Sequence, residues 1–159
     1  MLQSEKDEYH KRTLESIEKH GLFIQHVFDN NEDIQFSYSI GLYRNYQHPE
    51  IIILGLGEEL LYNVIDNLAD NIKNGKKYEA FSWSPDVLDN FECYFIEVDK
   101  TNYDEYVLGD IRLYGGNNFP LLQCIYPTTE GIYPWEETWP ERYKNLQPLL
   151  GPINKPEQL

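Results

Sequence analysis

His48 and Glu50 are the residues of this chain whose types and spacing best suit proton transfer. An imidazole titrates near neutral pH, and a carboxylate two residues away can orient it or accept a proton. A strand that starts after Pro49 would place both side chains near one strand end, where His26 could add a second imidazole. The alternative is structural: Pro49 fixes a turn, and His48 or Glu50 holds the loop backbone. Two histidines without known proximity define no metal site, so none is assigned.

A second candidate for chemistry is the run that ends at Gly41. Apolar Phe36, Tyr38 and Ile40 alternate with polar Gln35, Ser37 and Ser39. A period of two predicts a strand with its hydroxyl groups on one face, where they could line a pocket. The predicted pocket contains His26, Tyr38, Ser39, Gly41, His48, Glu50 and Gln123. The alternative is a half-exposed strand whose polar residues face water.

A third candidate is the aromatic turn from Gly131 to Glu136. Its rings could anchor a protein partner or stack on a planar ligand. The residues predicted to contact a partner are Tyr133, Trp135, Glu136 and Trp139. The alternative is that Tyr133 and Trp135 pack the C-terminal segment onto the core.

Common catalytic signatures are absent from the sequence. It contains no GxGxxG, GxxxxGK(S/T), GxSxG or HExxH pattern, which favours a function other than catalysis and gives no reason to assign a cofactor. Cys93 and Cys124 each lie in an apolar run, FECYF and LLQCIY, and no cysteine or histidine spacing matches a zinc site. We expect both thiols to be free and buried.

The chain is strongly acidic, with a formal net charge of −14 over 159 residues. This charge repels phosphate backbones and disfavours nucleic-acid binding, whereas it would steer a basic protein partner toward the molecule. The N-terminal residues lack the apolar segment of a signal peptide, and no apolar run is long enough to cross a membrane. The sequence therefore predicts a cytoplasmic protein.

The periodicities predict one α+β domain over 1–159, with an N-terminal helix (1–20), a core (21–126) and an irregular aromatic extension (127–159). The expected strands are 22–28, 35–40, 50–54, 91–98 and 119–126, and the expected helices are 4–19, 58–73 and 103–113. A turn is expected at 29–33 and a loop at 76–90. The sheet of about five strands should be mostly antiparallel, with a barrel-like closure as an alternative.

The chain resembles the bacterial family called domain of unknown function DUF4262. The resemblance covers about residues 20–150 and is carried by Gly21-Leu22-Phe23, Phe36 to Leu42, His48-Pro49-Glu50, Gly55-Leu56, Gln123, Pro127, Gly131 and Pro134-Trp135-Glu136. Two positions depart from the pattern: Ser39 stands in place of Thr, and Thr128 in place of Asp. The resemblance implies a small α+β domain and no activity. Residues 36–56 are also similar to the start of flavin reductase split barrels.

Two hypotheses of function follow. The first is an acidic protein-interaction module, with an immunity-type inhibitor of a basic toxin as its narrower form. The alternative is a domain or enzyme that binds a flavin-like or other planar ligand in the predicted pocket. A third hypothesis is a domain in which all of these residues are structural and whose partner leaves no local motif in the sequence.

Overall fold

The computed structural model describes residues 3–29 and 34–154, which form one α+β domain around a single six-stranded sheet. The strands are β1 (Phe23–Asp29), β2 (Ile34–Ile40), β3 (Glu50–Leu54), β4 (Ser82–Leu88), β5 (Phe91–Glu97) and β6 (Leu121–Ile125). The α-helices are α1 (Gln3–His20), α2 (Leu42–Tyr46), α3 (Glu58–Lys73), α4 (Tyr103–Tyr106) and α5 (Leu108–Tyr114). Two short 3-10 helices, Lys100–Asn102 and Glu141–Tyr143, complete the described elements.

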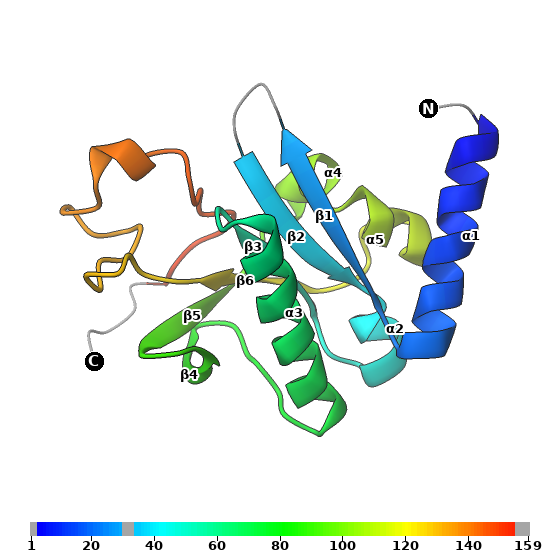
Figure 1. Cartoon of the computed structure of the whole chain (residues 1–159), viewed down its shortest axis with the longest axis horizontal. Helices are drawn as coiled ribbons and strands as arrows, with labels where there is room; N and C mark the ends of the chain where they lie inside the picture. The colour runs from blue at the N-terminus through cyan, green and yellow to red at the C-terminus, as the bar shows by residue number, and fades with distance from the viewer. Residues whose placement is uncertain (1–2, 30–33, 155–159) are drawn as a thin grey trace.

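The sheet is open and mostly antiparallel, with the strand order β1-β2-β3-β6-β5-β4. Only the β3 and β6 pairing is parallel, with Ile51 opposite Leu122. The predicted fold class and antiparallel character are confirmed, but barrel closure is wrong because β1 and β4 lie at opposite ends of the sheet (Figure 1). The β1-β2 pair forms as predicted, whereas most of its predicted turn, residues 30–33, lies outside the described residues.

One face of the sheet packs against helix α3. The helix buries an apolar stripe that includes Leu61, Ile65, Leu68 and Ile72, at the three- and four-residue steps that the sequence showed. This stripe lies on side chains such as Ile53, which alternate with those of the opposite face along β3. Cys93 and Cys124 are free and buried, as predicted.

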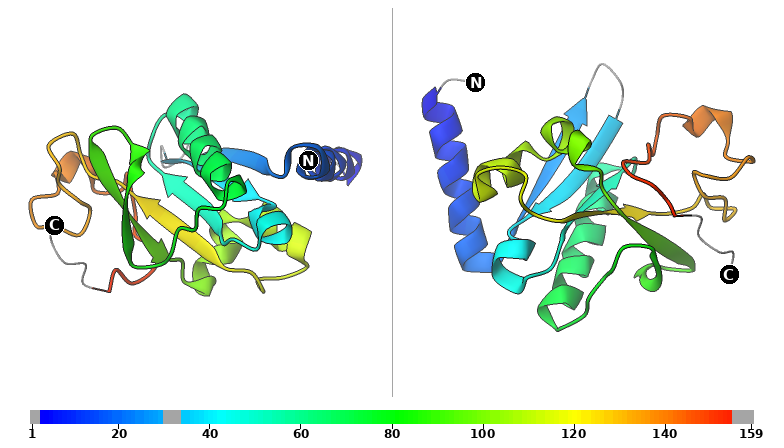
Figure 2. Two further views of the ribbon diagram at one scale, coloured as in Figure 1. Left: turned by 90° about the horizontal axis from the view of Figure 1, so that it is seen from below. Right: turned by 180° about the vertical axis from the view of Figure 1, so that it is seen from behind.

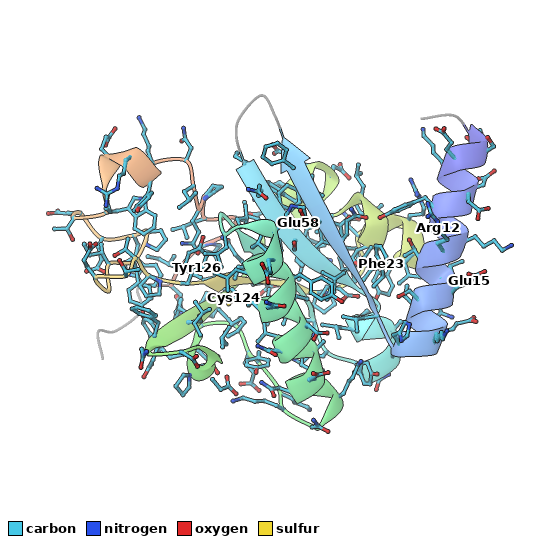
Figure 3. All side chains as sticks on the ribbon, viewed as in Figure 1. Arg12, Glu15, Phe23, Glu58, Cys124 and Tyr126 are labelled. Atoms are coloured by element: carbon cyan, nitrogen blue, oxygen red, sulfur yellow. The ribbon has the colours of Figure 1, made fainter. Side chains whose placement is uncertain are left out.

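The opposite face is covered in two parts. Helices α4 and α5 lie over the β1, β2 and β3 side, α1 lies beside the β1 edge and adds Ile17 to the same core, and the C-terminal extension covers β4 and β5 (Figure 2). Helix α1 is mostly exposed, buries only Thr13 and Ile17, and carries Arg12 and Glu15 at the end of the molecule away from Cys124 (Figure 3). The sheet thus has a helical half and an aromatic half.

Three features differ from the sequence prediction. Strand β4 occupies part of the predicted loop 76–90, which makes the sheet six-stranded and not five-stranded. Its Pro85 is tolerated because β4 is an edge strand and its register with β5 shifts between Ser84 and Leu88. Helix α2 was also not predicted, and the expected helix 103–113 is divided at Val107 into α4 and α5.

Candidate functional site

Glu50, the first residue of β3, has a fully buried carboxyl group that accepts hydrogen bonds from five donors. The donors are the Ser39 hydroxyl (2.7 Å), the backbone N–H groups of Gly41 (2.9 Å), Leu42 (3.0 Å) and Tyr43 (3.3 Å), and the Tyr114 hydroxyl. Burial raises the pKa of Glu50, and the hydrogen bonds from Tyr114 and Ser39 oppose that rise. An ionised carboxylate can only accept hydrogen bonds, so a site made of donors stabilises it.

This carboxylate determines where helix α2 begins. The N–H groups at the start of a helix have no partner within the helix, and Glu50 accepts from those of Leu42 and Tyr43. Gly41 lies at φ +116°, where a β-carbon would come within 3.2 Å of the Ile17 side chain. Ser39, Gly41 and Glu50 therefore lie together, but they form an enclosed clamp between β2, α2 and β3 that solvent does not reach.

Asp110 is a second buried carboxyl group on the same side of the sheet, and no pattern in the sequence indicated it. Its residue is fully buried in α5, and neither carboxyl oxygen has a hydrogen-bond partner among the described residues. Burial, reinforced by the charge of Glu50, raises the pKa of Asp110 well above its usual value. The phenol groups of Tyr38, Tyr103 and Tyr114 interact electrostatically with it. Burial without a hydrogen-bond partner therefore favours the protonated form of Asp110.

His48 is buried and engaged at both ring nitrogens. Its Nε2 accepts the backbone N–H of Tyr78 at 2.9 Å, so Nδ1 carries the proton and donates to the Pro49 carbonyl at 2.8 Å. Burial lowers the pKa of His48; the Pro49 hydrogen bond opposes this effect, and the positive charge of Lys77 adds to it. His48 thus joins the start of β3 to the loop after α3 as a neutral imidazole.

Two other predicted pocket residues, Tyr38 and Gln123, stand in register with Ile52 on either side of β3, and each is engaged with a different segment. The Tyr38 hydroxyl accepts the Gly109 N–H at 3.0 Å on the helical half of the sheet. Gln123 donates to the Pro148 carbonyl and accepts from the Leu150 N–H, each at 2.9 Å, and so holds the end of the extension.

His26 and His48 lie toward opposite ends of helix α3. The Nδ1 of His26 is 2.9 Å from the Ser37 hydroxyl, and this imidazole lines a groove with Glu58 at the start of α3. His48 lines a different cleft, with Ile72 from the last turn of the same helix. Because a 16-residue helix is about 24 Å long, the two imidazoles do not share a site.

The aromatic cluster, defined as Trp83, Tyr94, Tyr133 and Trp135, covers the far half of the sheet. Tyr133 and Trp135 stack with their centroids 4.9 Å apart, and Trp83 contacts both at 5.2 and 6.0 Å. Tyr94 is buried beneath, whereas Trp83, Tyr133 and Trp135 are only half-buried. The packing of the extension onto the sheet therefore leaves part of three rings exposed.

Hydrogen bonds fix the turn that carries two of these rings. The Tyr133 hydroxyl donates to the Glu92 carbonyl at 2.6 Å, and the Glu136 carboxylate accepts the Tyr133 N–H at 2.6 Å. Thr128 replaces the acid expected by family resemblance, and its hydroxyl accepts the Ile132 N–H at 3.1 Å. Trp139 lies apart, packed 5.9 Å from the Tyr143 ring and donating to its carbonyl.

The segments that carry the aromatic cluster are acidic, although Lys76 pairs with Asp86 and Arg142 interacts electrostatically with Glu130. Residues 79–97 and 127–141 contain no Lys, Arg or His. Their acidic residues are Glu79, Asp86, Asp89, Glu92, Glu97, Glu130, Glu136, Glu137 and Glu141. The sequence predicts Tyr133, Trp135 and Glu136 for this surface but not Trp83, because β4 falls within the predicted loop 76–90. Ring packing between β4 and the extension brings Trp83 into the cluster.

The described residues limit which other kinds of site this domain can hold. No group of three or more His, Cys, Asp and Glu side chains within 3–29 and 34–154 is arranged to bind a metal ion. Within the same ranges, every helix is too short or too polar to span a lipid bilayer.

The fold and the two regions define an acidic α+β domain with an open mixed sheet and an aromatic extension. The family described as Domain of unknown function (DUF4262) matches residues 16–140. The chain therefore belongs to the DUF4262 family. Comparison with curated proteins found no match, and comparison with solved structures found none either.

Proposed function

We propose that this protein is an interaction module that binds a basic protein through the aromatic cluster. The observation that carries the proposal is the partial exposure of Trp83, Tyr133 and Trp135 inside segments that have no basic residue. Aromatic side chains held rigidly by their neighbours are typical anchors of protein interfaces, because little entropy is lost when they bind. The acidic residues around them would form the polar rim.

Charge complementarity selects the partner. The net charge of −14 repels other acidic molecules and accelerates association with a basic surface. Asp89 and Glu137 are exposed residues of these acidic segments, and Glu137 follows Trp135 by two residues, so Glu137 would face that surface. The proposed partner therefore has a Lys- or Arg-rich face with an apolar recess for Trp135.

An immunity-type inhibitor is the narrower form of this proposal. In that case the partner is a toxin whose basic active site is covered by the acidic rim, with Trp135 as the anchor. This form predicts that the complex suppresses the activity of the partner. A partner that is bound but keeps its activity would support the interaction module and contradict the inhibitor.

Site-specific photo-crosslinking in the producing cell tests the location of the interface. A photoreactive amino acid replaces Glu137, beside the cluster, or Glu18, which is exposed on α1. We expect a basic protein to be crosslinked at position 137 and not at position 18. An acidic partner, or equal crosslinking at both positions, would contradict the proposed surface.

A small-molecule function is the second candidate, favoured by a cleft of about 420 Å³ beside His48. This volume lies within the range of ligand pockets. Native mass spectrometry with an absorbance spectrum of freshly purified protein tests the planar-ligand form. A stoichiometric extra mass or a visible absorption band supports it, whereas a clean apo mass, and no spectral change on adding flavins, would count against it.

A further inference from the structure

The cleft beside His48 is open to solvent and has apolar walls. Its walls are the segment before β3, the last turn of α3 with the loop after it, the end of β5 and the first residues of β6. Its apolar and aromatic lining comes from Tyr46, Pro49, Ile72, Tyr78, Ala80, Pro120, Leu121 and Leu122. The size and apolar character suit the body of a small organic molecule.

The charged groups of the cleft come from different walls and differ in sign. Lys77 lies in the loop after α3, and Glu97 is the last residue of β5. Both are exposed, and neither forms an ion pair in the described part of the chain. The neighbouring Lys76 is already paired with Asp86 and lies 5.3 Å from the centre of the Tyr78 ring. Glu79, in the same loop as Lys77, is a second exposed carboxylate that lines the cleft and has no ion pair within 3–29 and 34–154. Among the described residues, one unpaired cation and two unpaired anions thus line one largely apolar cleft, and Glu97 is the anion on the β5 wall.

His48 lines this cleft, but both of its ring nitrogens are already hydrogen-bonded, so neither is free to bind a ligand. Its Nε2 accepts the Tyr78 N–H, and its Nδ1 donates to Pro49. The Tyr78 side chain is fixed in addition by Asn71, which donates to its hydroxyl at 2.9 Å. Lys77 and Glu97 are therefore the groups that could bind a charged ligand, and the Tyr78 ring lines the cleft in a fixed position.

We propose that this cleft binds a small zwitterion with an apolar body, of the class of the hydrophobic amino acids. Its carboxylate would face Lys77, its ammonium group would face Glu97, and its side chain would lie among Ile72, Tyr78 and Leu122. A ligand with charge of one sign would pair with Lys77 or with Glu97 but not with both, whereas a zwitterion can pair with both. The inference is independent of protein binding, because it concerns residues outside the aromatic cluster.

Three indole compounds test the assignment of each charge. L-tryptophan carries both ligand charges, 3-indolepropionate carries only the carboxylate, and tryptamine carries only the ammonium group. Each is titrated into ¹⁵N-labelled full-length protein, with the amide signals of Lys77 and Tyr78 as reporters. The variants are Lys77→Ala and Glu97→Gln, with exposed Lys144→Ala and Glu15→Gln as matched controls.

We expect saturable binding of L-tryptophan, with shifts centred on Lys77 and Tyr78. Lys77→Ala should weaken L-tryptophan and 3-indolepropionate about tenfold and leave tryptamine unchanged, because a hydrogen bond to a charged group is lost. Glu97→Gln should weaken L-tryptophan and tryptamine by a similar factor, and the two control variants should bind as wild type does. The proposal is overturned if no saturable shift occurs at the cleft, if neither variant weakens binding, or if 3-indolepropionate binds as tightly as L-tryptophan.

Discussion

The buried carboxyl groups of the helical half and the aromatic cluster of the other half use their side chains in opposite ways. Glu50 has the residue type expected at a catalytic site, yet five donors enclose it and solvent does not reach it. Trp135 has the residue type expected in a core, yet it is only half-buried. We therefore base the proposed binding surface on the partial exposure of its rings and not on residue type.

The largest expected effect is on the stability of the helical half. Replacing Glu50 with Ala leaves the buried N–H groups of Gly41 and Leu42 and the Ser39 hydroxyl without their acceptor, so the free energy of unfolding should fall by about 3 kcal/mol or more. Urea unfolding measures this loss. Glu15→Ala, an exposed change on α1, is the control and should have little effect. A Glu50→Ala variant as stable as wild type would show that the clamp does not hold this end of the sheet.

His48 should make the protein less stable in acid. Its pKa is lowered in the folded state, so below about pH 6.5 the unfolded chain binds a proton that the folded chain does not, and stability falls. His48→Ala should lower the free energy of unfolding by about 1–3 kcal/mol at pH 7.5, because the Tyr78 N–H loses its acceptor. The loss should be smaller at pH 5. Urea unfolding at both pH values, with His20→Ala as the control, measures the difference. A cost that is the same at both pH values would contradict a neutral His48.

Asp110 should make the protein less stable as the pH rises, which is opposite to the effect of His48. Its pKa is raised in the folded state, so stability is greatest below about pH 3.9 and is lost as the pH rises toward the folded-state pKa. Asp110→Asn should remove this loss, so that its stability relative to wild type increases from pH 4 to pH 9. Exposed Asp104→Asn should show no such trend. An advantage that shrinks with rising pH would show that Asp110 is stabilised as a carboxylate.

The smallest effect on stability is expected at the rim of the aromatic cluster. Glu137 is exposed, so Glu137→Lys should change the free energy of unfolding by less than about 0.5 kcal/mol. Thermal and urea unfolding against Glu18→Lys, the same charge reversal on α1, measure this directly. A large loss would mean that the acidic rim holds the extension in place, and the contrast between the two halves would then fail.

The regular elements were the part of this fold that the sequence could predict. Helix α3 and strand β3 have the predicted bounds, because unbroken periods of 3.6 and a continuous β-branched run identify them. Helix α2 could not be predicted, since it depends on the carboxylate of Glu50, which is later in the chain. Strand β4 was missed because Pro85 and the register shift remove its alternation.

Much of the candidate site depends on contacts that no local pattern encodes. Asp110 looks like an ordinary acidic residue in the first turn of a helix, and only the tertiary fold brings Tyr38 and Glu50 close to it. Trp83 joins the aromatic cluster through the extension, about fifty residues further along the chain. The turn with Tyr133 and Trp135 was identified from its composition, although composition alone did not show how far its rings are exposed.

The affinity for the crosslinked partner tests the central claim most directly. Isothermal titration calorimetry would compare wild type with Trp135→Ala, Glu137→Lys and the control Glu18→Lys, at low and at high salt. We predict that Trp135→Ala weakens binding about 30-fold or more, as expected for an interface anchor, and that Glu137→Lys weakens it mainly at low salt. Unchanged affinity in folded Trp135→Ala and Glu137→Lys proteins would contradict the assignment of the aromatic cluster as the binding surface.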